Sequence, residues 1–191
     1  MLLLAGLAAI GFVAGVHPFL ATNSPVAADT LVVEGWVPAY VLDAAVRESR
    51  SSSYSHIFVS GLEAEGGVEG EATAAAGHLI AGGVSATKVI AVSAAPVNFN
   101  RTSYMARAIR DRIRALGVQP SGVNVITLGP HGRQSRLAYQ RMLGPKIPVG
   151  VITIPKNDYD PARWWASSAG LKKTLKDFAG WFKEVLFGLR S

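Results

Sequence analysis

The sequence contains no cysteine, and only 17% of its residues are charged. The lack of cysteine excludes disulfide frameworks, cysteine-ligated zinc, iron–sulfur clusters and thiol nucleophiles. It does not indicate a compartment, because proteins without disulfides occur on both sides of a membrane. Hydrophobic residues make up 49% of the chain, which excludes a disordered protein. A length of 191 residues suits one domain with a sizeable core.

Charge is also missing from the first 21 residues, which include no Asp, Glu, Lys or Arg. About 20 apolar residues are enough for a helix to cross the hydrocarbon core of a bilayer. A cleaved secretory signal is one alternative, but such a signal begins with basic residues, and the first one here is Arg47. A buried helix of a soluble domain is another, which apolar residues on every face disfavour. We therefore predict a transmembrane anchor over residues 1–21, a linker over 22–28 and a globular domain over 29–191.

Short β-favouring runs alternate with helical patterns throughout the rest of the chain. The expected strands are residues 30–33, 56–59, 88–92, 123–127 and 149–154. The expected helices are residues 38–49, 69–81, 102–116 and 132–143, followed by a long last helix from Pro161. Asp160 is expected to cap the start of that last helix. This alternation predicts an α/β fold, a three-layer Rossmann-like sheet of about five parallel strands with helices on both faces.

Ligands of open parallel sheets bind at the carboxyl ends of the strands, so the residues that follow each strand are the candidates for a site. Polar residues and glycines gather there, namely Glu34, Gly35, Ser60, Gly61, Asn100, Arg101, Thr102, His131, Arg133 and Arg136. Arginines beside helix N-termini are suited to an anion, while solvated loops and helix faces are the alternative. Glu34, at the end of a buried strand, is either a partner for an arginine or a catalytic group.

The charges are unevenly distributed along the chain, whose net charge is +6. Residues 29–100 hold three basic and eight acidic residues, whereas residues 101–146 hold nine basic residues and one acidic residue. The sequence has no Gly-x-Gly-x-x-Gly motif and no Walker loop, and its four histidines lack metal-ligand spacing. We therefore expect an anionic small molecule as ligand, and we assign no metal and expect no nucleic acid.

The last helix is expected to dock on the sheet through one apolar face. Its members are spaced four, three, four and three residues apart: Leu171, Leu175, Phe178, Phe182 and Val185. Four lysines fall off that face and should be exposed, and Trp181 and Phe187 fall partly off it: Lys172, Lys173, Lys176 and Lys183. These lysines and aromatics either meet an anionic membrane surface or form a solvated basic face.

Six stretches carry a resemblance to a known family. They are ADTLVVEGWVP, IFVSG, the helix start at Glu71-Ala72, VSAAPVNFNRTSYMA, VNVITLGPHGRQSRLAYQRMLG and YDPARWWASSAGLKKTL. In order and spacing the chain from about residue 28 to 188 resembles the SanA/YdcF/ElyC-like family of bacterial envelope-associated α/β proteins. The resemblance implies an N-terminal membrane helix, a Rossmann-like domain, and a single-pass inner-membrane location with the domain on the extracytoplasmic side.

The resemblance also implies site residues. The Ser-Gly that ends the family's second strand matches Ser60 and Gly61, and the Glu that opens the next helix matches Glu71. The turn before the third helix matches Asn100, Arg101 and Thr102. The segment after the fourth strand matches Thr127, His131 and Arg136, with Arg133 nearby. The family's Gly-rich first turn is replaced here by Glu34-Gly35-Trp36.

Two classes of function follow. The first is a membrane-tethered binder or enzyme for an anionic small molecule or a lipid-linked phosphate of envelope metabolism, with His131 and Glu71 as catalytic groups and the arginines as phosphate clamps. Within this class, the family resemblance implies S-adenosylmethionine or a nucleotide as an alternative ligand. The second class is a non-catalytic envelope component that assembles through Trp164, Trp165 and the last helix.

Overall fold

The computed structural model describes residues 1–63 and 70–188, and the side chains of all of these except residues 2–10. It contains five strands: β1 (Thr30–Glu34), β2 (His56–Leu62), β3 (Val89–Ala94), β4 (Val123–Leu128) and β5 (Val149–Ile154). The helices are α1 (Leu2–Leu20), α2 (Ala39–Ser51), α3 (Glu71–Ala81), α4 (Arg101–Ala115), α5 (Gly132–Leu143) and α6 (Ser168–Phe187), with 3₁₀ turns η1 (Gly129–His131) and η2 (Pro161–Ala166). The helix expected over residues 69–81 corresponds to α3, and its expected first residue, 69, lies outside the described residues.

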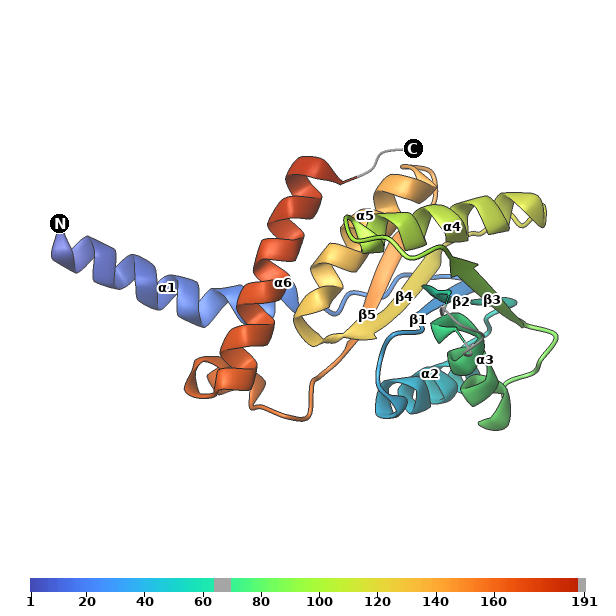
Figure 1. Cartoon of the computed structure of the whole chain (residues 1–191), viewed down its shortest axis with the longest axis horizontal. Helices are drawn as coiled ribbons and strands as arrows, with labels where there is room; N and C mark the ends of the chain where they lie inside the picture. The colour runs from blue at the N-terminus through green and yellow to red at the C-terminus, as the bar shows by residue number, and fades with distance from the viewer. Residues whose placement is uncertain (64–69, 189–191) are drawn as a thin grey trace.

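The five strands form one parallel sheet in the order β3-β2-β1-β4-β5. This confirms the expected Rossmann-like α/β fold. The helices α2 and α3 cover one face of the sheet, and α4 and α5 cover the other (Figure 1). The chain order reverses between β1 and β4, so a crevice opens at their carboxyl ends, where such folds bind ligands.

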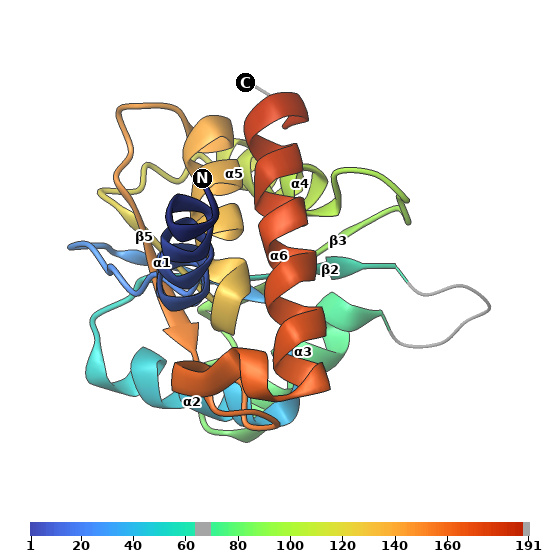
Figure 2. The same ribbon diagram turned by 90° about the vertical axis from the view of Figure 1, so that its left-hand side faces the viewer.

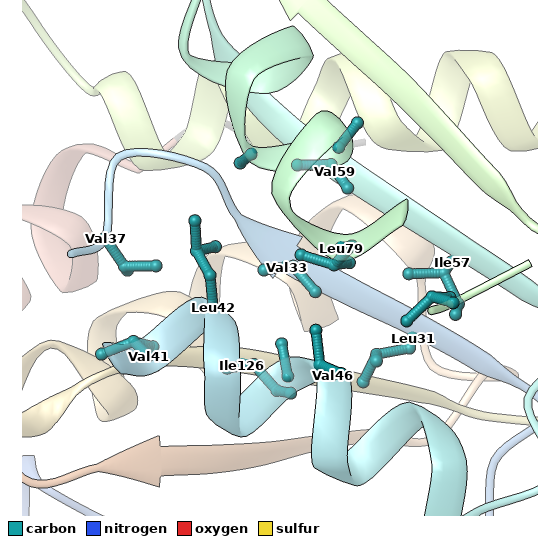
Figure 3. Close-up of a cluster of buried hydrophobic side chains, with 14 of the residues drawn as sticks. Leu31, Val33, Val37, Val41, Leu42, Val46, Ile57, Val59, Leu79 and Ile126 are labelled. Carbon is teal, nitrogen blue, oxygen red and sulfur yellow. The ribbon is translucent and has the colours of Figure 1, made fainter. Parts of the chain in front are cut away.

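Buried aliphatic side chains make the two layers of core. Alternate residues of the inner strands point to opposite faces, as a strand period of two requires. Leu31, Val33, Ile57 and Val59 pack against α2 and α3 (Figure 3). Val32, Phe58 and Val125 pack against α4 and α5 on the other face. Strands buried on both sides explain why these runs are apolar without alternation.

The end of α1 packs on the domain instead of standing apart from it. Val16 and Leu20 are buried in a small cluster with Tyr159 and Trp164. The indole Nε1 of Trp164 donates to the Val13 carbonyl at 3.0 Å, and His17 Nε2 lies 3.0 Å from the Tyr159 hydroxyl. α1 is therefore held by its last two turns, and its direction relative to the domain is set by these contacts.

The linker that follows α1 is also tied down. The backbone of Ser24 forms an antiparallel bridge with Val151 of β5, and the Val26 amide donates to Asn124 Oδ1. This differs from the expected separation of anchor, linker and domain. Within the part of the chain that the structure describes, no helix has the length and apolar character needed to cross a membrane.

The last helix differs most from its expected form. It is interrupted at Ser167, whose extended backbone ends η2 and whose hydroxyl caps α6 by accepting from the Gly170 amide at 3.0 Å. Asp160 caps η2 as expected, accepting from the Ala162 amide. The expected docking face is wrong: Leu171, Leu175 and Phe182 are exposed, and α6 instead buries a polar face made of Thr174, Asp177 and Glu184.

Polar partners on the domain explain this reversal. The Glu184 carboxylate accepts from the Ser103 hydroxyl at 2.7 and 2.8 Å, and the Arg141 guanidinium lies 3.6 Å from it. Asp177 faces His131 at the sheet edge. Because these buried charges have partners, α6 docks by ion pairs and hydrogen bonds, and its apolar side points outward.

Candidate functional site

A cavity of about 330 Å³ lies at the crevice between β1 and β4. Its floor comes from the ends of β1 and β2, one wall from the start of α4 and η1, and the other wall from α6. Eight of the candidates that sequence reasoning or the resemblance singled out lie at or directly behind it: Glu34, Gly35, Ser60, Glu71, Asn100, Arg101, Thr102 and His131.

Glu34 ends β1 as a buried carboxylate with neutral partners. It accepts from the Thr127 hydroxyl at 2.5 Å and from the Ser135 hydroxyl at 2.9 Å. Its Oε2 atom lies 4.0 Å from His131 Nε2. Thr127 thus acts behind the cavity wall and does not line it. Glu34 has no arginine partner among the described residues, so the first of its two expected roles is not seen.

His131 is held between two elements. Its Nδ1 atom lies 3.5 Å from Asp177 Oδ1, and its Nε2 atom lies 3.3 Å from the Thr102 hydroxyl. An ionised carboxylate only accepts, so the Nδ1 proton faces Asp177, and Nε2 of the neutral ring accepts from Thr102. Gln134 Nε2 donates to the same hydroxyl at 3.3 Å. The ring therefore has one nitrogen oriented by a carboxylate and one turned to the cavity side, the arrangement of a general base.

The Asp177 carboxylate is suited to remain ionised. Burial acts to raise its pKa, but the hydrogen bond from His131, the charge that His131 carries once it is protonated and the charge of Lys173 together outweigh burial and leave the pKa below its ordinary value. The Lys173 ammonium lies 2.7 Å from Asp177 Oδ2. The negative charge opposite His131 is thus maintained at neutral pH.

The start of α4 presents backbone and side-chain groups to the cavity. Asn100 precedes the helix in the left-handed region, with φ of 52°. Its Nδ2 atom donates to the Phe187 carbonyl, while its Oδ1 atom is buried and has no hydrogen-bond partner among the described residues. No side chain caps the start of α4, so its first amides have no side-chain acceptor.

Two glycines allow the close approach that builds the cavity floor. The Gly35 amide donates to the Ser60 carbonyl at 2.6 Å, and a Cβ atom at Gly35 would lie 2.8 Å from that oxygen. A Cβ atom at Gly61 would lie 2.4 Å from the Ala72 amide nitrogen. These glycines therefore serve packing of β1 and β2 against α3, and Gly61 does not line the cavity.

Four cationic side chains surround the cavity: Arg101, Lys173, Lys176 and Lys183. Arg101 lies 3.5 Å from Glu71, whose other oxygen accepts from the Leu62 amide. The Lys183 ammonium lies 4.5 Å from the centre of the Phe99 ring. Lys176 is exposed and has no carboxylate within ion-pair distance in the described part of the chain. Arg101 and Lys173 thus lie in ion pairs with Glu71 and Asp177, and Lys176 and Lys183 leave the rim with positive charge, while the floor carries the Glu34 carboxylate.

Two expected site residues lie elsewhere. Arg133 and Arg136 line a separate groove between α5 and α6, together with Trp181. Arg133 donates to the Phe19 carbonyl and stacks on its ring at 3.8 Å, and Arg136 donates to the Val149 carbonyl. Burial, and then the neighbouring Arg136 charge, lower the pKa of Arg133. On the helix α5 that starts at Gly132, these side chains turn away from the sheet edge, so neither contributes to the cavity.

Sequence reasoning missed the contribution of α6. Lys173, Lys176 and Lys183 were expected on an exposed face of the last helix, Trp36 was noted only as part of the turn after the first strand, and Asp177 and Gln134 were not singled out. The sequence offered one signal. Lys173, Lys176, Asp177 and Lys183 lie on a different side of the helix from its apolar residues, so the helix has a distinct polar side. Nothing in the sequence, however, indicates that this polar side packs at the sheet edge.

No protein-family model matches the chain, and no curated protein matches it. The resemblance to the SanA/YdcF/ElyC-like family therefore remains an expectation from the motifs quoted above.

Proposed function

We propose that this protein is a membrane-anchored component of the bacterial cell envelope that binds an anionic small molecule or the phosphate of a lipid-linked one. The observation that carries the proposal is the convergence of four cations and one histidine on a single cavity at the sheet edge. Uncapped amides at the start of α4 supply further donors for phosphate oxygens.

The cavity is suited to a ligand that carries both negative charge and hydroxyl groups. The lysines and Arg101 at its rim favour an anion. The unpartnered Oδ1 atom of Asn100 requires a donor, and a hydroxyl or amide of the ligand would supply one. The Glu34 and Glu71 carboxylates disfavour an anionic group on the floor, so the phosphate belongs at the rim beside Lys176 and Lys183.

His131 gives the site a group for proton transfer. With Nδ1 oriented by Asp177, the Nε2 atom accepts a proton from a hydroxyl held in the cavity, either that of Thr102 or that of a ligand. In the proposed role, His131 accepts the proton, Asp177 orients the ring, and the cations hold the phosphate group of the ligand.

The membrane part of the proposal rests on the sequence. The first 21 residues contain no charged side chain, and the resembled family carries a membrane helix at this place. Phe12 and Phe19 of α1 are partly exposed beside α6, at the point where the helix leaves the domain.

Thermal denaturation of the full chain in detergent tests the binding proposal. The panel comprises inorganic phosphate, pyrophosphate, a nucleotide, S-adenosylmethionine and a water-soluble isoprenyl phosphate. A ligand at one hundred times its Kd stabilises the folded state by about 2.7 kcal/mol, which raises the melting temperature by roughly 5–10 °C for a chain of this size.

The panel separates the candidates. A shift with phosphorylated compounds that is lost in an Arg101→Ala, Lys176→Ala variant supports the proposal. A shift with S-adenosylmethionine or the nucleotide alone identifies that compound as the ligand instead. No shift with any compound at saturating concentration contradicts a binding function for the cavity.

A further inference from the structure

The outward side of α6 carries a continuous apolar stripe. Its members are spaced four, four, three and four residues apart: Leu171, Leu175, Ala179, Phe182 and Leu186. At 3.6 residues per turn this spacing places all five on one narrow side of the helix. The four large side chains have exposed fractions of 39%, 46%, 50% and 54% in chain order. A soluble surface rarely carries such a row of apolar residues without an occupant.

Lysines border one side of the stripe. Lys172, Lys176 and Lys183 lie next to it on the helix surface, between the apolar residues and the cavity. The opposite border packs on α1, where Phe178 meets Phe12 edge to face with ring centres 5.4 Å apart. The apolar stripe is thus continuous with the apolar helix α1 on one side and with cations on the other.

The placement of α6 relative to α1 decides which occupant fits the stripe. In Figure 1, α1 projects away from the domain, and α6 crosses the end of α1 that meets the domain. Seen along the direction in which α1 projects, α6 lies in front of the sheet and its long side faces the viewer (Figure 2). The buried side of α6, with Thr174, Asp177 and Glu184, faces the domain behind it in this view, so the opposite side of α6 faces the direction in which α1 points.

We propose that α6 lies in the interface of the lipid bilayer that α1 enters, with its apolar stripe against the acyl chains and its lysines at the level of the phosphate groups. The inference rests on the membrane anchoring in the proposed function. A helix in this position buries its apolar side by about 5–10 Å and gains from anionic lipids. The row of lysines beside the stripe matches the charge of such lipids, and a bilayer around α1 necessarily meets the face from which α1 emerges.

Because the chain has no cysteine, single labels can be introduced without background. The full chain is reconstituted in vesicles that contain anionic lipid, with a nitroxide at Leu175→Cys, Phe182→Cys or Lys172→Cys. Ala115→Cys is the matched control, since Ala115 is exposed at the end of α4, remote from α1 (Figure 1). Electron paramagnetic resonance measures how often each nitroxide collides with oxygen, which concentrates in lipid, and with a water-soluble nickel complex. The ratio of the two collision rates reports whether the position lies in lipid or in water.

The expected result is a severalfold higher oxygen-to-nickel ratio at positions 175 and 182 than at position 115, with position 172 in between. Ratios at 175 and 182 equal to that at 115 overturn the inference. Protection of both positions from both reagents overturns it too, since a second copy or another protein then covers the stripe. Melting temperatures near that of the parent chain show that the variants are folded, as expected for exposed positions.

The outcome is distinguishable from failure of the proposed function. If α6 is in water while the anion-induced thermal shift persists, only the interfacial placement is wrong. If the chain is not retained on vesicles at all, both the membrane anchoring and this inference are wrong. Thermal denaturation with the ligand panel still tests the binding of an anion independently.

Discussion

The Nδ1 atom of His131 lies 3.5 Å from the Oδ1 atom of Asp177, across the boundary between η1 and α6. His131 follows the inner strand β4, and Asp177 belongs to α6, the last helix of the chain. The cavity is therefore complete only when α6 is docked. The contact between His131 and Asp177 therefore both orients the histidine in the cavity and helps to attach α6 to the domain.

Replacement of the Asp177 carboxylate should destabilise the chain in a pH-dependent way. The pKa of Asp177 is below its ordinary value of 3.8, so the carboxylate contributes stability above that value and the contribution is lost as pH falls through the lowered pKa. We expect Asp177→Asn to lower the free energy of unfolding by roughly 2 kcal/mol at pH 7. The difference from the parent chain should narrow below pH 3.8.

Urea unfolding across pH 2.5 to 7 measures the difference in free energy of unfolding between the parent chain and Asp177→Asn. The control is Asp111→Asn, which removes an exposed carboxylate on α4 and should change stability by less than about 0.5 kcal/mol. A constant Asp177→Asn effect over the whole range would show that the charge of the carboxylate is not involved.

Ligand affinity should depend on the rim cations and not on Arg136. For a phosphorylated ligand from the thermal panel, Arg101→Ala and Lys176→Ala should each raise Kd roughly three- to tenfold, because each removes one charge-assisted contact. Arg136→Ala removes a cation of similar exposure that faces the other groove. Titration calorimetry measures all three, and an equal loss with Arg136→Ala would show a general charge effect.

The two glycines near α3 should respond oppositely to alanine. At Gly61 a Cβ atom would lie 2.4 Å from the Ala72 amide nitrogen, so α3 must shift at a cost of roughly 1–3 kcal/mol. Gly77 is exposed within α3, and apart from its chain neighbours and the backbone of its own helix no heavy atom of the described chain lies within 4 Å of an added Cβ atom. Gly77→Ala should therefore stabilise by about 0.5–1 kcal/mol.

Chemical denaturation of the two variants decides this pair. If both destabilise, α3 tolerates no side chain at either place, and the close approach at Gly61 is not the specific constraint.

The hydroxyls that donate to Glu34 should each contribute to stability. Thr127→Val and Ser135→Ala each remove one donor to a buried carboxylate and should cost roughly 1–3 kcal/mol. Their effects should not be additive, because both act on the same carboxylate. A double-mutant cycle measures the coupling, and strict additivity would mean that Glu34 does not join the two hydroxyls.

The sheet was predictable because its signal is local. The strand Thr30–Glu34 is a short β-favouring run that is buried throughout, and glycines follow the ends of α3, α4 and α5. The convergence of Ser60, Arg101 and His131 also followed from topology, since the ends of parallel strands share an edge. Glu71 was expected only from the family resemblance.

The remainder depends on packing that no local pattern encodes. Arg133 lies in the first turn of α5 and Arg136 about one turn from its start, and the rotation of the helix carries both side chains to the far groove. For α6, the regular spacing of Leu171, Leu175 and Phe182 indicated a buried face, yet the ion pairs of Asp177 and Glu184 decide which side docks. Apolar periodicity identifies the helix but not the medium that its apolar side meets.

Attachment of α6 to the domain has a kinetic consequence. Asn100 donates to the Phe187 carbonyl at the end of the helix, and Asp177 and Glu184 hold its middle. A helix attached at these three places does not swing open as a lid, so the cavity is entered through a permanently open mouth. Ligand association is then a single bimolecular step, whose observed rate rises linearly with concentration and shows no plateau from a slow opening.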